Sequence, residues 1–187
     1  MAKAQRLHYA ARVMNVDWPA RFREVYDRGN QAWGEGRKSP GAMFTREDTG
    51  FLATLGCTGQ ELFDFVDDFR RYSEPDFATA LEVAAVRRQY FLEVLQGKST
   101  GRTIDMNDLP AKTAAVDGIV WLPRLIEKAR AKLRGEMPDD LMYGCGGDRE
   151  FLRNKRVTLP AFLRLVWECG DDTRRIIDGF KRAAGLP

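Results

Sequence analysis

Hydrophobic residues along the chain recur at intervals of three and four positions, and strictly alternating patterns hardly occur. The first period is typical of amphipathic helices, whereas alternation would indicate strands. In the first half the pattern predicts four helices: one from Trp18-Pro19 to Gly34, a short one stopped by Gly56, one that follows Thr58, and the longest over about 75–96. In the second half it predicts four more: one from Trp121 to Gly135, a short one around 148–155, one that follows Thr158, and a last one that Asp171 caps.

Several of these helix starts carry capping signals. Asp17 precedes the first helix and can accept a hydrogen bond from one of its free N–H groups. Thr45-x-x-Asp48 and Thr58-x-x-Glu61 have the spacing of capping boxes, in which two side chains satisfy two backbone N–H groups reciprocally. Ser73-x-x-Asp76, with a proline between them, predicts the start of the longest helix.

Two segments indicate linkers, because glycine and proline stand close to polar residues at 37–41 and throughout 98–117. The remaining segments carry helix patterns. The sequence therefore predicts an all-α fold: a compact helical domain of about eight helices that spans 1–187 as a single domain.

The two halves of the chain resemble each other at an offset of one hundred residues. Residues 43–69 align without a gap on 143–169, with identities at Asp48/Asp148, Phe51/Phe151, Leu52/Leu152, Thr58/Thr158 and Val66/Val166. The order of the predicted helices also matches, which favours two pseudo-symmetric repeats, about 17–98 and 117–185, with a groove where they meet. The alternative is two unrelated helical hairpins of similar length.

The most unusual stretch runs from Tyr143 to Asp148 and contains three glycines and a cysteine. The repeat places Cys145 at the capping position that Thr45 occupies in the first half, although a thiol is a poor capping acceptor. A helix N-terminus stabilises a thiolate, so Cys145 is a candidate nucleophile, with Asp148 and Tyr143 as candidate catalytic partners. The alternative is a tight helix start with no chemistry.

Candidate ligand-binding residues lie around this stretch. Gly146 and Gly147 would let backbone N–H groups turn toward an anion. Arg124 and Lys128 stand four residues apart on one helix face and could bind a carboxylate or a phosphate, unless one of them pairs internally with Asp148. Arg88 interrupts the longest apolar helix beside a second arginine, and one of the two is expected to face the groove.

Composition and charge narrow the function classes. The chain has 187 residues, of which 44% are hydrophobic and 30% charged, and no apolar run approaches the length that spans a bilayer. The net charge of +3 is too small to indicate nucleic-acid binding, so neither a membrane nor a nucleic acid is expected as a partner. Residues 17–98 carry 11 basic and 14 acidic side chains and residues 120–187 carry 14 and 10, so the halves have opposite net charges of −3 and +4.

The numbers of cysteines and histidines narrow the possible function classes further. Three scattered cysteines and one histidine favour a reducing cytoplasm over a disulfide framework, and they predict neither a zinc site nor a cofactor. The basic N-terminus, 1–16, lacks the continuous apolar core of a secretory signal and is expected to be an arm or a first helix.

Two short motifs of the second half resemble those of an uncharacterised bacterial family, domain-of-unknown-function family 5069. The first is Leu122-Pro123-Arg124 followed by Lys128, and the second is Tyr143-x-Cys145-x-x-Asp148 leading to Phe151-Leu152. The resemblance covers about 117–185 and implies a compact helical fold with no assigned activity. Gly144 and Gly146 stand where members of the family carry asparagine and proline.

These features support two hypotheses about function. The first is a small cytoplasmic enzyme or binding protein that acts on a small anionic molecule in the groove between the repeats. The alternative is a non-catalytic module for protein–protein interaction or self-association into a homo-oligomer, in which the oppositely charged halves orient the partners.

Overall fold

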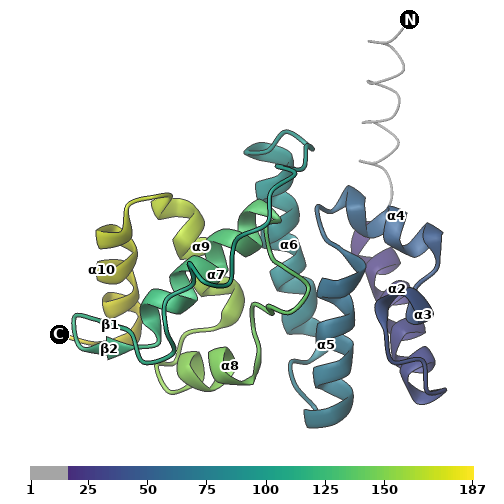
Figure 1. Cartoon of the computed structure of the whole chain (residues 1–187), viewed down its shortest axis with the longest axis horizontal. Helices are drawn as coiled ribbons and strands as arrows, with labels where there is room; N and C mark the ends of the chain where they lie inside the picture. Colours follow the sequence, from purple (N-terminus) through teal and green to yellow (C-terminus); the bar gives the residue numbers. More distant parts are fainter. Residues whose placement is uncertain (1–16) are drawn as a thin grey trace, which may run out of the picture.

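The computed structural model describes residues 17–187, and the predicted N-terminal arm lies outside them. The regular elements of the described chain are helices apart from one short hairpin (Figure 1). Its elements are α2 (Trp18–Gly34), α3 (Pro40–Met43), α4 (Arg46–Thr54), α5 (Gly59–Tyr72), α6 (Phe77–Glu93), β1 (Ala115–Val116), β2 (Ile119–Val120), α7 (Leu122–Arg134), α8 (Gly146–Arg153), α9 (Leu159–Cys169) and α10 (Thr173–Ala184). The predicted all-α class is confirmed.

Helix α6 is the element at which the two halves of the chain meet. It packs against α2 on the first-half side and against α7 and α9 on the second-half side (Figure 1). Six of its residues are buried. Five of them are apolar or small, and the sixth is Arg87; they are Ala80, Val83, Ala84, Val86, Arg87 and Phe91. The remaining core is built around the pairs α2 with α5 and α9 with α10.

Most of the predicted helix starts are confirmed. Asp17 accepts a hydrogen bond from the N–H of Ala20 at 3.2 Å. Thr45 with Asp48, and Thr58 with Glu61, form complete capping boxes at the starts of α4 and α5. Each of these three helices therefore begins where a side-chain oxygen satisfies one of its free N–H groups.

Two predicted starts were wrong because a neighbouring residue takes the capping role. Ser73 does not begin the longest helix: it ends α5 in a left-handed conformation, and Asp76 caps α6 by accepting from the N–H of Thr79 at 2.9 Å. Asp171 does not cap the last helix, because its carboxylate pairs with Arg134 at 2.6 Å. Asp172 accepts from the first turn of α10 instead.

The structure also contains two elements that the sequence did not predict. Helix α3 forms a single turn where a linker was expected, with Pro40 in its first position. Strands β1 and β2 pair as an antiparallel hairpin at the end of the predicted 98–117 linker. Asp117 and Gly118 form its turn with φ values of 49° and 74°, which is the backbone conformation of a tight hairpin turn.

Buried positions recur at the offset of one hundred found in the sequence. In α2 the buried residues include Phe22, Val25 and Tyr26, and in α7 they include Leu122, Leu125 and Ile126. Helices α4 and α8 begin at positions 46 and 146, and α5 and α9 at 59 and 159. The correspondence between the halves thus includes α2 and α7, which precede the aligned segments. That the two halves are related by pseudo-symmetry stays a prediction.

Gly56 is the glycine whose substitution should damage this core most directly. Its φ is +72°, and an added Cβ would lie 2.6 Å from the Phe91 ring on α6. We expect Gly56→Ala to lower the free energy of unfolding by about 2–4 kcal/mol, since left-handed strain adds to overpacking. Gly36→Ala is the matched control: its φ is +88° but nothing lies within 4 Å, so a loss of only about 1 kcal/mol is expected. Urea denaturation followed by circular dichroism measures both, and equal losses would contradict the packing argument.

Candidate functional site

The predicted catalytic stretch is organised around the buried carboxylate of Asp148. Asp148 has no exposed surface and accepts hydrogen bonds from Trp121 Nε1 at 3.0 Å, from the N–H of Gly144 at 2.9 Å and from Lys128 Nζ. Lys128 itself is only 2% exposed. The side chains of α7 and α8 therefore meet in a desolvated ion pair. This is the alternative considered from the sequence, in which Lys128 pairs with Asp148 and not with a ligand.

Cys145 lies beside this pair. Its Sγ accepts a hydrogen bond from Lys128 Nζ at 3.3 Å, and the half-buried side chain makes no capping bond to α8. The neighbouring glycines allow close packing. An added Cβ at Gly147 would lie 2.8 Å from the Trp121 indole, and one at Gly144, whose φ is +90°, would lie 2.9 Å from Leu159.

Tyr143 is a buried wall of the same region. Its hydroxyl donates to the carbonyl of Leu159 at 2.8 Å, and the side chain is 2% exposed. Burial, and secondarily the charge of Asp148, raises the pKa of Tyr143 well above its ordinary value, so the phenol keeps its proton.

The other predicted ligand-binding residues are engaged elsewhere. Arg124 Nη1 donates to the carbonyl of Pro110 at 2.8 Å and holds the long connection onto α7. The Arg88 guanidinium lies 5.4 Å from the centre of the Trp18 ring. The structure thus brings together Cys145, Asp148 and Lys128 and gives Arg124 and Arg88 separate partners.

The first half contains a corresponding network at the same offset. Asp48 is 2% exposed and accepts from Arg28 and from Thr45 Oγ1, the latter at 2.8 Å. Although burial opposes ionisation, the hydrogen bonds from Arg28 and Thr45 hold the pKa of Asp48 below its ordinary value. Arg28, Thr45 and Asp48 stand one hundred positions before Lys128, Cys145 and Asp148. A carboxylate that joins two consecutive helices is therefore a feature of both halves.

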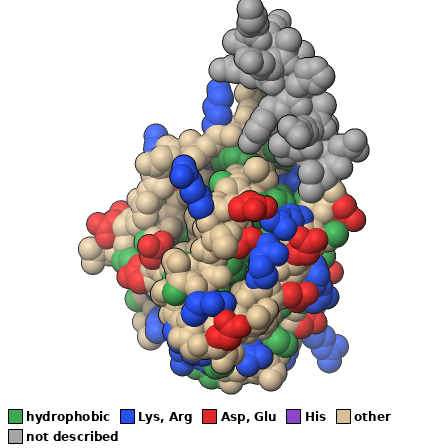
Figure 2. Space-filling view, turned by 90° about the vertical axis from the view of Figure 1, so that its right-hand side faces the viewer, with side chains coloured by type: hydrophobic (Ala, Val, Ile, Leu, Met, Phe, Trp, Pro, Cys, Tyr) green, Lys and Arg blue, Asp and Glu red, His purple; other side chains and the backbone are tan. Residues whose placement is uncertain are grey.

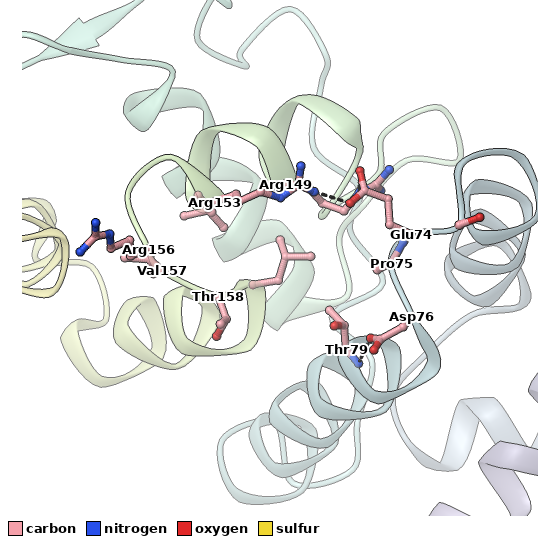
Figure 3. Close-up of a pocket in the computed structure, with 12 residues that line it drawn as sticks. Glu74, Pro75, Asp76, Thr79, Arg149, Arg153, Arg156, Val157 and Thr158 are labelled. Carbon is pink, nitrogen blue, oxygen red and sulfur yellow. Dashed lines mark hydrogen bonds and ion pairs between the residues drawn. The ribbon is translucent and has the colours of Figure 1, made fainter.

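A groove of about 540 Å³ lies between the two halves. The connection from α5 to α6 forms one side, and α8 with the connection to α9 forms the other (Figure 3). Its lining consists of Ser73, Glu74, Pro75, Asp76, Thr79, Arg149, Leu152, Arg153, Arg156, Val157, Thr158 and Leu159. None of the predicted catalytic or ligand-binding residues belongs to that lining.

Arg149 is the buried cation of the groove. Its side chain is 6% exposed, and Nη1 donates to Asp68 and to the carbonyl of Gly144, both at 2.6 Å. Its Nε lies 3.5 Å from Glu74 Oε1 but makes no hydrogen bond within the described chain. Arg149 is therefore held in place by its Nη1, while its Nε–H group is a buried donor without a hydrogen-bond partner among residues 17–187.

The other two arginines are exposed. Arg153 pairs with the carboxylate of Glu74, and Arg156 makes no ion pair among residues 17–187. Figure 3 shows Arg149 and Arg153 close to Glu74 and places Arg156 at the opposite end of the groove. Hydrogen bonds from Thr79 lower the pKa of Asp76, the remaining acid of the lining, so it stays ionised.

Sequence reasoning missed these arginines because, on an amphipathic helix or in the turn that follows it, an arginine is indistinguishable from a solvated surface charge. The comparison of the two halves of the sequence does distinguish these arginines. At the offset of one hundred, Thr49, Ala53 and Gly56 precede Arg149, Arg153 and Arg156, so all three cations are specific to the second half.

Two other spaces are less suited to an anion. A hollow of about 520 Å³ beside the hairpin has Lys155 and Lys181 in its lining, but Lys181 lies 3.7 Å from the Asp117 carboxylate. The lining also includes the apolar Ile119, Phe151 and Leu186. A space of about 10 Å³ lies beside Asp64, whose pKa burial raises to about 6, and its size admits a single water molecule. Within residues 17–187 no cluster of acidic, cysteine or histidine side chains is arranged to hold a metal, and no helix is long and apolar enough to cross a membrane.

The buried and the exposed ion pairs should differ in what they contribute to stability. Lys128→Met leaves Asp148 without its cation at full burial, and we expect a loss of about 3–5 kcal/mol in the free energy of unfolding. Arg28→Met removes the corresponding cation from Asp48, but the Arg28 side chain is 40% exposed, so a loss below about 1 kcal/mol is expected. Urea denaturation measures both values, and similar losses would show that the two networks are equally solvated.

The three thiols should also differ in reactivity. We expect iodoacetamide at pH 7.5 to modify Cys145 faster than Cys169, because the Lys128 ammonium group donates a hydrogen bond to the Cys145 sulfur at 3.3 Å. Cys57 should stay unmodified in the folded protein, because burial, followed by the charge of Glu61, raises its pKa to about 11. Peptide mass spectrometry over time measures the three rates, with urea-unfolded protein as the control in which they converge. Equal rates at Cys145 and Cys169 in the folded protein would contradict the activation of Cys145.

Comparison with known proteins bears on the second half only. No curated protein and no solved structure matches the chain significantly. Residues 106–183, which include α7 to α9 and most of α10, match the model of a protein family described as a domain of unknown function (DUF5069), so the predicted resemblance of the second half to that family is confirmed.

Proposed function

We propose that the protein binds a small molecule with an anionic group in the groove between the α5–α6 connection and α8. The observation that carries the proposal is a buried arginine, Arg149, in the wall of a cavity whose lining also includes Arg153 and Arg156. Arginine offers planar pairs of N–H donors that match carboxylate and phosphate oxygens.

The size of the groove supports a small-molecule ligand. Its volume of about 540 Å³ falls within the range of ordinary ligand pockets, which is about 300–1,000 Å³. Leu152, Val157 and Leu159 give the groove an apolar wall, and the hydroxyl groups of Ser73, Thr79 and Thr158 supply polar contacts. This mixture suits a ligand with a charged group and a short apolar body.

The charges of the groove support an anion. The lining includes three arginines and two acids, Glu74 and Asp76, so it carries a net charge of +1, and the Asp68 carboxylate that pairs with Arg149 lies outside it. Arg149 is already held by Asp68 and by the carbonyl of Gly144. A cation fixed before binding loses little conformational entropy when the ligand arrives, and this strengthens binding.

The position of the groove fits the predicted arrangement of two repeats. The α5–α6 connection belongs to the first predicted repeat, and α8 belongs to the second. We therefore infer that the groove is the junction of two pseudo-symmetric units and that the second unit supplies the arginines.

The proposal is one of binding and assigns no reaction to the groove. Cys145, Asp148 and Tyr143, the predicted catalytic residues, lie outside its lining. The cysteines of the described chain are all free thiols, which supports the proposed cytoplasmic location.

The alternative function, an interaction module, has less support from the surface. The large exposed apolar residues within the described chain are Tyr72, Val94 and Val120, and they lie on separate elements. Single apolar residues of this kind are normal on monomeric proteins. Figure 2 shows acidic and basic side chains interspersed on the first-half face, where Arg21 pairs with Glu24 and Arg23 with Asp27.

Binding of simple anions tests the proposal. We expect phenyl phosphate or benzoate to raise the thermal unfolding temperature and to shift the amide NMR signals of Arg149, Arg153 and Thr158, whereas uncharged benzyl alcohol should do neither. Arg153→Ala should weaken binding about 10- to 100-fold, because a charge-assisted hydrogen bond contributes about 1.5–3 kcal/mol.

Arg175→Ala is the matched control, because Arg175 is exposed on α10 and lies outside the groove lining. It should leave the affinity unchanged. Absence of binding by both anions, or equal weakening by the two variants, would overturn the proposal.

A further inference from the structure

Glu74 occupies the place in the groove that an anionic ligand would take. Its Oε1 lies 3.5 Å from Arg149 Nε, and its Oε2 accepts a hydrogen bond from Arg153 Nη2. The carboxylate thus bridges the two arginines closest to each other in the lining (Figure 3). Its side chain is 39% exposed, so it can rotate into solvent.

The local backbone does not depend on the Glu74 side chain. Ser73 ends α5, and Asp76 caps α6, so the residues around Glu74 satisfy the helix ends. Arg149 also keeps a nearer carboxylate, that of Asp68 at 2.6 Å, when Glu74 moves away. Displacement of Glu74 therefore exposes cationic donors and leaves the two helix caps and the Arg149–Asp68 pair intact.

We propose that Glu74 is an internal competitor for the groove and that the ligand group that displaces it is a phosphate monoester in its dianionic form. This inference rests on the proposed function. A ligand carboxylate that replaced the carboxylate of Glu74 would exchange one negative charge for one, and it would have to compete with a group tethered beside the arginines. A dianion interacts about twice as strongly with the same cations.

The donors of the groove also favour a phosphate group. A phosphate monoester offers three acceptor oxygens, and a carboxylate offers two. Besides the guanidinium groups of Arg149 and Arg153, the lining includes the hydroxyls of Ser73 and Thr158. Thr158 Oγ1 accepts from the N–H of Ala161 and so retains its own proton for donation.

Phenyl phosphate and phenyl sulfate have nearly the same shape but different charges, so a comparison of their affinities measures the effect of charge alone. Both present a tetrahedral group with three terminal oxygens on the same ring, but the phosphate gains a second negative charge with a pKa of about 6 and the sulfate does not. We expect phenyl phosphate to bind on the order of tenfold more tightly at pH 7.5, which corresponds to about 1.4 kcal/mol, and the difference to disappear toward pH 5. The charged protein groups around the bound ligand would be Arg149, Arg153, Arg156, Asp68 and Asp76.

Glu74→Gln tests the competitor directly. Loss of the internal carboxylate should raise the affinity for both probes about tenfold, because neither probe then has to displace a charged group from the arginines. Glu82→Gln removes the same charge from the exposed surface of α6, outside the groove lining, and should change neither affinity. Isothermal titration calorimetry measures both probes with the full chain. If Glu74→Gln does not fold, Glu74→Ala removes the same carboxylate and replaces it in the test, while the comparison of the two probes at two pH values with the unaltered chain decides whether the ligand group is a dianion.

The outcomes distinguish this inference from the proposed function. If no anionic probe binds the unaltered chain or Glu74→Gln, the proposed function fails. If the probes bind with equal affinity at pH 7.5, the anion site stands and the assignment to a dianionic phosphate is overturned. If Glu74→Gln leaves both affinities unchanged, the anion site stands and the role of Glu74 as a competitor is overturned. Binding to vesicles that contain phosphatidic acid without binding of phenyl phosphate would overturn the assignment to a soluble phosphate monoester.

Discussion

The ion pair between Lys128 and Asp148 is the interaction on which the second half depends. Both groups have lost nearly all contact with water, which is unfavourable for isolated charges. The pair is tolerated because Asp148 also receives hydrogen bonds from Trp121 and from the backbone of Gly144. These contacts fix α8 against α7. Since α8 carries Arg149 and Arg153, the geometry of the groove follows from the packing of the buried pair on its other side.

The two halves solve the same packing problem with different chemistry. Arg28 is 40% exposed where Lys128 is 2% exposed, and Thr45 donates to Asp48 where Cys145 accepts from Lys128. The architecture explains the carboxylate and the cation in both halves. It does not require a thiol, because the first half forms its helix start with threonine. The chemical difference between the halves therefore concentrates at Cys145 and at the arginines of α8.

Helix positions could be predicted because they depend on local signals: the three- and four-residue period, the capping boxes at Thr45 and Thr58, and the glycine stops. The hairpin was missed although Asp117-Gly118 is a turn signal, since its strands have only two residues each. The groove was missed for another reason. Whether an arginine on α8 is solvated or lines a cavity depends on where the α5–α6 connection lies, and that contact joins residues about eighty positions apart. Only the comparison of the halves, with Ala53 standing where the second half has Arg153, carries this information in the sequence.

Helix α8 links the two networks, because Asp148 and Arg149 are consecutive residues with separate partners. Asp148 turns to Lys128 on α7, and Arg149 turns to Asp68 on α5 and to the carbonyl of Gly144. A ligand that binds only when α8 is docked stabilises the docked state by mass action. If the proposed ligand binds in this way, reciprocity predicts that any change that weakens the Lys128–Asp148 pair also weakens its binding. Cys145 accepts a hydrogen bond from Lys128 at 3.3 Å, so a modification of the thiol is expected to disturb the same ion pair although Cys145 does not line the groove.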